Sequence, residues 1–197
     1  MVENDANAWT LGEYWRGAAR GCQNVVLLTL GTGIGGGLVS GGRLLRGANG
    51  FAGEIGHIVV DPDGPPCPCG QRGCWERFAS GSALARMAGG RRGEDVTAAA
   101  ARGDADALEL IDRFAWWLAL GLANLANILD PSLIVLGGGL IESGGVILEP
   151  ARRAFRELVE GVGHRPDIPI VAATLGERAG AIGAALLARP TGTVEAN

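Results

Sequence analysis

Residues 25–45 read VVLLTLGTGIGGGLVSGGRLL and contain the pattern that decides the fold. The apolar run Val25–Leu30 is rich in β-forming residues and predicts a buried strand. Glycine-rich residues 31–37 predict a turn, and residues 38–45, split by two glycines, predict a hairpin. A G-x-G-x-x-G match indicates dinucleotide binding only where a helix follows, and here a strand follows. The turn is therefore either a plain hairpin turn or one whose backbone N–H groups and Thr32 hydroxyl bind phosphate.

Helices and strands alternate along the rest of the chain. Residues 4–20 predict a helix with Asn4 or Asp5 as its N-cap, and residues 106–129 predict the longest helix because leucine, isoleucine and phenylalanine recur on one stripe. Residues 61–73, with four prolines and three glycines, predict a loop. The other predicted helices span 75–87, 96–102, 146–160 and 180–189, and the other predicted strands span 58–60, 132–136 and 168–172. This alternation predicts an α/β fold.

Composition excludes several classes of protein. Apolar residues make up 47% of the 197, which is enough for a core, but none of the apolar runs reaches the ~18 residues of a membrane span. The formal net charge is −4, so the composition predicts neither a nucleic-acid nor a membrane partner. All 17 basic residues are arginine, which excludes a Walker-type GK[ST] loop and a Schiff-base lysine. The chain opens without a basic-then-apolar leader, and we expect a cytoplasmic protein.

Three of the four cysteines lie close together beside a histidine. The spacing His57-x9-Cys67-x-Cys69-x4-Cys74 supplies one imidazole and three thiolates, a complete tetrahedral set for a structural Zn²⁺ ion. The alternative is that these are ordinary loop cysteines. Cys22 stands apart and is expected to be a small buried hydrophobic residue.

Acidic residues flank the predicted helix start and the cysteine loop. Asp5 is either a simple N-cap or a general base toward a hydroxyl group. Glu54 precedes His57 by three residues and Glu76 follows the last loop cysteine by two, so both are either solvated acids or ligands for a polyhydroxylated molecule. Residues 137–139, three glycines after a predicted buried strand, are either a strand-to-helix turn or part of a ligand site.

The sequence resembles the ROK family of sugar kinases and repressors, and within it the actinobacterial-type glucokinases. The resemblance covers residues 3 to about 188, and its most specific motif is the cysteine run. The matching blocks are ENDANA (3–8), LGTGIGGG (30–37), GANGFAGEIGH (47–57), CPCGQRGCWE (67–76), ASGSAL (79–84), LDPSLIVLGGGL (129–140) and LGERAGAIGAALLA (175–188). The resemblance implies a two-lobed, actin-like (ribonuclease H-like) ATPase fold and ATP-dependent phosphorylation of a hexose 6-hydroxyl, with glucose as the expected sugar.

The resemblance also implies a role for individual residues. Asp5 would be the base that takes the proton from the sugar hydroxyl. The sugar hydroxyls would be bound by Asn4, Glu54, His57 and Glu76. Zinc would be held by one nitrogen of His57 and by Cys67, Cys69 and Cys74. ATP, with Mg²⁺, would meet Thr32 and Gly33 at its phosphates and Gly138 and Gly139 near its adenosine. Family kinases commonly pair through the large lobe, so we expect a homodimer.

The chain departs from the family pattern at its start. Family kinases open with a strand and an Asp-x-Gly-Gly-Thr phosphate loop, and that motif does not occur in the 197 residues. We therefore expect residues 1–24 to be the remnant of the N-terminal lobe with a lobe-crossing helix. Residues 25–175 would be the C-terminal large lobe with a zinc loop at 57–76, followed by a returning helix at 176–189 and a tail at 190–197. The small lobe would be mostly missing, and the chain alone would be an incomplete kinase.

Two other functions remain open at this point. One is a kinase for fructose or an N-acetylhexosamine. The other is a sugar-responsive transcriptional repressor of the same family, in which a helix-turn-helix would precede the kinase-like part.

Overall fold

A computed structural model describes residues 4–142 and 145–188, which fold around one five-stranded sheet of order β3-β2-β1-β4-β5. The strands are β1 (Val25–Leu30), β2 (Ile34–Ser40), β3 (Arg43–Leu44), β4 (Leu133–Gly137) and β5 (Ile170–Ala172). Strands β1, β2 and β3 pair antiparallel, whereas β4 pairs parallel with both β1 and β5. The sheet is therefore mixed, and the predicted α/β class is confirmed.

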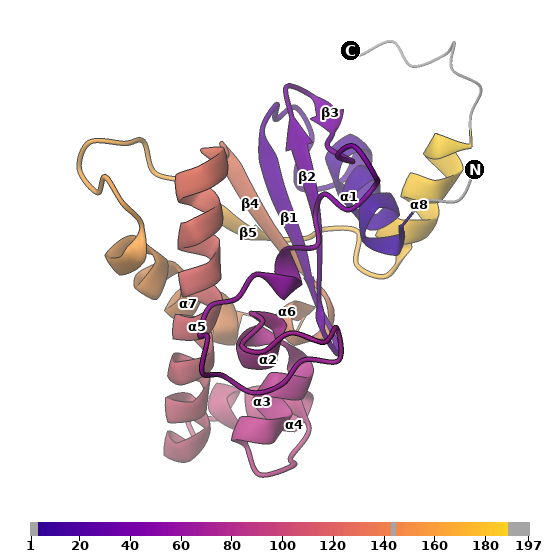
Figure 1. Cartoon of the computed structure of the whole chain (residues 1–197). Coiled ribbons are helices and arrows are strands. Elements are labelled where there is room, and N and C mark those ends of the chain that lie inside the picture. Colours follow the sequence, from indigo (N-terminus) through magenta and orange to yellow (C-terminus); the bar gives the residue numbers. More distant parts are fainter. Residues whose placement is uncertain (1–3, 143–144, 189–197) are drawn as a thin grey trace.

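Helices cover both faces of this sheet (Figure 1). Helices α1 (Asp5–Arg16) and α8 (Arg178–Leu187) lie together on one side, and α5 (Ala105–Leu129) and α7 (Gly145–Leu158) lie on the other. The short elements η1 (Ile55–His57), α2 (Glu76–Ala79), α3 (Gly81–Met87), α4 (Gly93–Ala101) and α6 (Gly139–Glu142) complete the described chain. None of the helices in this described part combines the length and apolar character that crossing a membrane needs.

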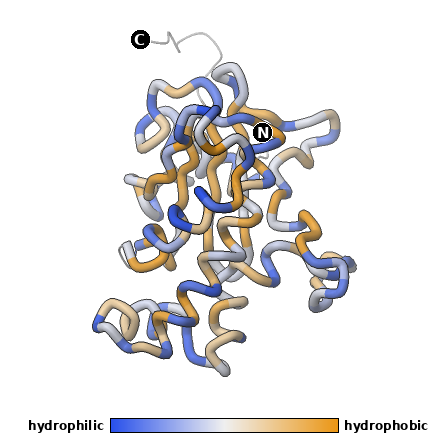
Figure 2. Tube along the Cα trace, turned by 90° about the vertical axis from the view of Figure 1, so that its left-hand side faces the viewer, coloured by the Kyte–Doolittle hydropathy of each residue, from blue (hydrophilic) through white to orange (hydrophobic). Residues whose placement is uncertain are grey.

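Alternate residues of the central strands point to opposite faces. Val25 and Leu27 pack on the α1 side with Trp9, whereas Val26 and Leu28 join the larger core on the α5 side. Because both faces are covered, β1 is apolar along almost its whole length and not alternating. Figure 2 shows the same arrangement, with hydrophobic colouring along the central strands. The predicted strand at 25–30 and long helix at 106–129 are confirmed to within one residue.

The predicted turn over residues 31–37 is wrong in its second half, because β2 already occupies most of it. The glycines of this strand make room for other elements. A side chain on Gly36 would overlap Ile55 of η1, and one on Gly37 would overlap Thr10 of α1. The glycines are therefore explained by close packing against the strand.

Three further expectations are corrected or fall outside the description. Residues 58–60 do not form a strand of the sheet: Ile58 O accepts from Trp75 N at 2.8 Å, so this segment pairs with the end of the cysteine loop. The first helix ends at Arg16 and not at residue 20, because the Glu13 carboxylate binds Ala18 N, at 2.8 Å, beyond the helix end. The predicted tail at 190–197 lies outside the described residues, as does residue 189.

Candidate functional site

One cleft of about 460 Å³ lies where the β1–β2 turn, the end of β4 and the start of α1 meet. Four predicted site residues line it: Asp5, Gly33, Glu76 and Gly138. The other lining residues are Ala6, Trp9, Thr29, Gly31, Ile34, Gly35, Glu177 and Gly180. Because β1 and β4 are parallel neighbours, the cleft opens at their carboxyl ends, where α/β proteins commonly bind small molecules.

Asp5 is the first residue of α1 but not its N-cap. The cap is Asn4, whose Oδ1 accepts from Ala6 N at 2.8 Å and from Asn7 N at 3.3 Å. The Asp5 carboxylate is exposed, and its Oδ1 accepts from Ala6 N at 2.8 Å. The helix start therefore holds the Asp5 carboxylate at the cleft and leaves it accessible to a ligand, as a general base requires.

The glycine turn between β1 and β2 is held in place from two sides. Gly31 O accepts from Gly81 N, at the start of α3, at 2.7 Å. The Glu76 carboxylate fills the space that a side chain on Gly33 would need. Across the cleft, Gly138 has a φ of +93° and packs directly on the backbone of Leu30, so a residue with a side chain would be strained there. Backbone thus forms much of the cleft wall, which suits the close approach of a phosphate.

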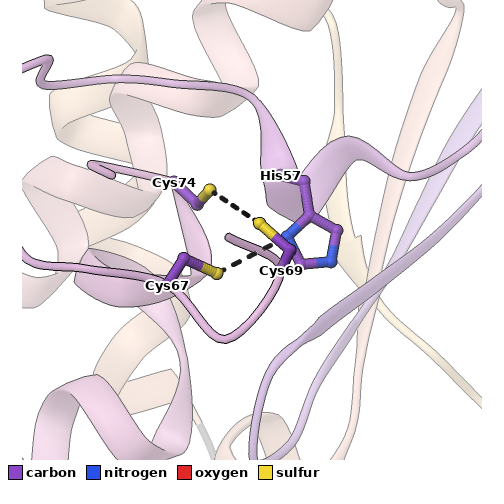
Figure 3. A group of neighbouring side chains, drawn as sticks. All are labelled: His57, Cys67, Cys69 and Cys74. Carbon is purple, nitrogen blue, oxygen red and sulfur yellow. Dashed lines mark hydrogen bonds between the residues drawn. The ribbon is translucent and has the colours of Figure 1, made fainter. Parts of the chain in front are cut away.

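The predicted metal-binding residues come together. The ligand atoms of His57, Cys67, Cys69 and Cys74 all lie within 4.8 Å of one another (Figure 3). Cys67 Sγ lies 3.7 Å from His57 Nδ1, and Cys69 Sγ lies 3.6 Å from Cys74 Sγ. These four side chains form a group that could hold a metal ion.

The protonation of the three thiols differs with their surroundings. Burial raises the pKa of Cys67 to about 12 and also raises the pKa of Cys74. A backbone hydrogen bond at Gln71 lowers the pKa of the exposed Cys69. The protonated Cys67 thiol donates to Glu76 Oε1 at 3.1 Å. Glu76 therefore connects the cysteine group to the glycine turn of the cleft.

The other predicted site residues do not line the cleft. Glu54 is exposed in the segment before η1, and Asn4 is occupied as the N-cap of α1. His57 turns Nδ1 toward Cys67, which leaves Nε2 on the other side of the ring (Figure 3). Thr32, in the glycine turn, and Gly139, at the start of α6, are also absent from the lining.

Among the cleft residues that the sequence did not predict are Glu177 and Gly180. Both lie at the start of α8, far from the other site residues in sequence. The available signal was the block at 175–188, which matched the family pattern but suggested no role for its acidic residue.

The fold and the cleft define a small-molecule-binding α/β protein, and the comparisons identify its family. The chain belongs to the ROK family, whose sequence model matches residues 1–191. A glucokinase from Streptomyces coelicolor is 42% identical over 211 residues, covering 96% of this chain and 67% of that protein. A xylose repressor from Bacillus subtilis is 34% identical, covering 93% of this chain and 48% of the repressor.

A solved structure agrees with this assignment. The crystal structure of a ROK family glucokinase from Streptomyces griseus, in complex with glucose and AMPPNP, superposes with a TM-score of 0.90 at 43% identity. The match covers 96% of this chain and 68% of that one. This chain therefore spans about two thirds of the length of these glucokinases and about half that of the repressor.

Proposed function

We propose that this chain carries the acceptor site of an ATP-dependent glucokinase. The observation that supports this most directly is the shared cleft, in which Asp5 and Glu76 face a glycine turn and Gly138. Such a cleft offers carboxylates for a polyhydroxylated acceptor and backbone for a phosphate donor. The glucokinases from two Streptomyces species, at 42% and 43% identity, supply the substrate class.

In the proposed reaction Asp5 is the general base. The 6-hydroxyl oxygen of glucose attacks the γ-phosphorus of ATP while its proton passes to the Asp5 carboxylate. The bond between the γ-phosphorus and the bridging oxygen breaks, and ADP leaves. Phosphoryl transfer depends mainly on positioning and charge stabilisation. The main contribution of α1 to the reaction would therefore be to hold the Asp5 carboxylate in position.

Glucose would be bound by side chains on both sides of the cysteine group. Glu76 lines the cleft directly, and the Nε2 of His57 is the ring nitrogen left over for a sugar hydroxyl. Glu54 and Asn4 remain proposed sugar ligands from the family resemblance. The ATP phosphates would meet Thr32 and Gly33, and the adenosine would lie near Gly138 and Gly139.

The cysteine group fits a structural zinc ion. Zn–S bonds of ~2.3 Å at tetrahedral angles place two thiolates about 3.8 Å apart, and a thiolate about 3.6 Å from a histidine nitrogen. Two of the separations agree with these values: 3.6 Å between Cys69 Sγ and Cys74 Sγ, and 3.7 Å between Cys67 Sγ and His57 Nδ1. His57, Cys67, Cys69 and Cys74 would hold zinc with no open position, so its contribution would be to tether the loop that carries Glu76.

The domain arrangement is also a proposal. Residues 25–175 would form the large lobe of the actin-like fold, with its zinc loop at 57–76. Residues 1–24 and 176–189 would belong to the helices that lead to the second lobe. The packing of α1 on α8 supports this pairing, since a side chain on Gly183 would overlap the backbone of Ala8.

We further propose that two copies pair through α5, in the cytoplasm, where ATP and reduced thiols are available. Leu108, Trp116 and Ile128 of this helix are large apolar residues that are 43%, 42% and 75% exposed. Light scattering at tens of micromolar tests this: a dimer is expected, with Ile128→Asp shifting it to a monomer. A wild-type monomer would overturn the pairing.

A sugar-responsive repressor is the second candidate, favoured by the match to the xylose repressor at 34% identity. A kinase for fructose or an N-acetylhexosamine is the third. Sugar-binding and phosphotransfer assays separate the repressor from the kinases, because a repressor that has kept only sensing would bind sugar without transferring phosphate. The sugar that is phosphorylated separates the kinases from one another.

A coupled glucose 6-phosphate assay tests the proposed activity. It compares the 197-residue chain with a longer protein that carries an Asp-x-Gly-Gly-Thr loop before residue 1, and we expect turnover only in the longer one. In that protein Asp5→Asn should lower kcat about 10²–10⁴-fold. Asp63→Asn, at an exposed position of the 61–64 turn, is the control and should leave kcat unchanged. Full activity of Asp5→Asn would refute the role of this carboxylate.

A further inference from the structure

Trp75 lies between two residues of the site and is itself fully buried, at 0% exposure. Cys74 on one side belongs to the metal-binding group, and Glu76 on the other lines the cleft. Consecutive Cα atoms are about 3.8 Å apart, so whatever fixes the backbone of Trp75 also fixes the origin of both neighbouring side chains.

The Trp75 ring is seated on helix α5. A side chain on Gly121 would overlap the indole atoms Cδ2, Cε2 and Cζ2, so this glycine forms a notch that the ring fills. One turn earlier, the carbonyl of Trp117 accepts the indole N–H of Trp75 at 2.8 Å. Phe78 stacks on the Trp117 ring with the centroids 4.2 Å apart and covers the same part of the helix. The Trp75 ring is therefore held on α5 both by its close fit against Gly121 and by its hydrogen bond to the Trp117 carbonyl.

The backbone of Trp75 is tied to a third segment. Its N–H donates to Ile58 O at 2.8 Å, directly after His57. Val59 and Cys74 form an isolated β-bridge beside this bond. Trp75 thus connects α5 to the segments that supply His57, Cys74 and Glu76, none of which belongs to the central sheet.

We infer that Trp75 and Gly121 are positioning residues for glucose binding, acting through Glu76 and Cys74. This rests on the proposed glucokinase function. Helix α5 spans Ala105–Leu129 and is anchored in the main core, so it provides a rigid reference for a loop that has little regular structure of its own. Because the Trp75 ring is held in the Gly121 notch, the position of α5 fixes the positions of Cys74 and Glu76.

Gly121→Ala tests the notch, because its methyl group needs the space of the Trp75 ring. In the form that phosphorylates glucose, we expect the KM for glucose to rise at least tenfold with kcat changed less than threefold. Zinc retention against a chromophoric chelator should fall in parallel. The milder Trp75→Phe removes the second ring and the N–H. The double variant Trp75→Phe/Gly121→Ala should recover most of the KM, since the added methyl fills space that phenylalanine leaves.

Ile111→Ala is the matched control for a merely structural effect. Ile111 is buried on the same helix, about 15 Å along the axis from Gly121, and its truncation leaves a cavity in the same core. We expect it to lower the Tm but not to change the glucose KM or the zinc retention. Equal KM and zinc values for Gly121→Ala and Ile111→Ala, or no recovery in the double variant, would overturn the inference.

The outcome separates this inference from the proposed function. If the longer protein without substitutions does not phosphorylate glucose, the proposed function fails, and zinc retention alone then decides whether the notch positions Cys74. If that longer protein neither phosphorylates glucose nor retains zinc, both proposals are overturned.

Discussion

Glu13 is a buried carboxylate that joins three parts of the chain. It lies in α1 at 0% exposure. Its Oε2 accepts from Ala18 N at 2.8 Å, and its Oε1 accepts from Thr174 N at 3.1 Å and from Leu175 N at 2.7 Å. The first donor follows the end of α1, and the other two lie on the segment that leads from β5 to α8. Glu13 therefore holds together the two helices whose first turns border the cleft.

Replacing Glu13 by alanine would leave these three backbone N–H groups without their acceptor. A buried donor without a partner costs about 1–3 kcal/mol, so three set a lower limit of about 3 kcal/mol. Single changes that break a buried hydrogen-bond network rarely cost more than about 4–5 kcal/mol, so we expect Glu13→Ala to cost about 3–5 kcal/mol. For a chain of this size each kcal/mol lowers the Tm by about 2–4 °C, which gives a loss of about 6–20 °C.

Thermal unfolding followed by circular dichroism measures this loss. Glu13→Gln keeps the shape but turns an N–H₂ group toward N–H donors, so it should still cost about 2 kcal/mol. Glu157→Ala is the control, because Glu157 is exposed on α7 and surface changes usually stay within about 0.5 kcal/mol. A Glu13→Ala protein within 1 kcal/mol of the wild type would refute the reasoning.

Three further outcomes are expected. Excess chelator should lower the Tm of the zinc-loaded wild type by several degrees in scanning fluorimetry. It should leave the Tm of Cys67→Ser unchanged, because that variant has already lost a zinc ligand. Equal Tm shifts in the two proteins would contradict the zinc assignment. Gly37→Val should cost about 1–3 kcal/mol in denaturant unfolding, because its side chain overlaps Thr10. Gly138→Ala should weaken ATP binding at least tenfold by calorimetry, because φ of +93° strains alanine against Leu30; unchanged affinity would exclude it from the nucleotide site.

The sequence predicted the elements whose signal is local. The Val25–Leu30 run is apolar and β-forming, and the stripe from Ile111 to Leu129 repeats at helical spacing, so neither needs knowledge of its neighbours. The cysteine group was also predictable, because the ligand types and their spacing lie within twenty residues of the chain. Each of these features is determined by residue types and spacings that all lie within one short segment of the chain.

The errors occurred where a distant segment decides the conformation. Gly36 and Gly37 have turn-like composition, but Ile55 and Thr10 pack onto them from other elements, and the strand continues. Residues 58–60 have strand composition, but they pair with the end of the cysteine loop and not with the sheet. Glu177 was missed for the same reason, since only the packing of α8 on α1 brings it to the cleft.

The two carboxylates of the cleft are positioned by different anchors. Asp5 begins α1, which is held through Glu13 and by close packing on α8. Glu76 begins α2, which follows the Trp75 seat on α5, on the opposite face of the sheet. Neither carboxylate is part of a strand, so the sheet does not set their separation directly. The distance between these two carboxylates is instead determined by two independent buried contacts, one on each face, and changes at Glu13 and at Trp75 should therefore act on the site separately.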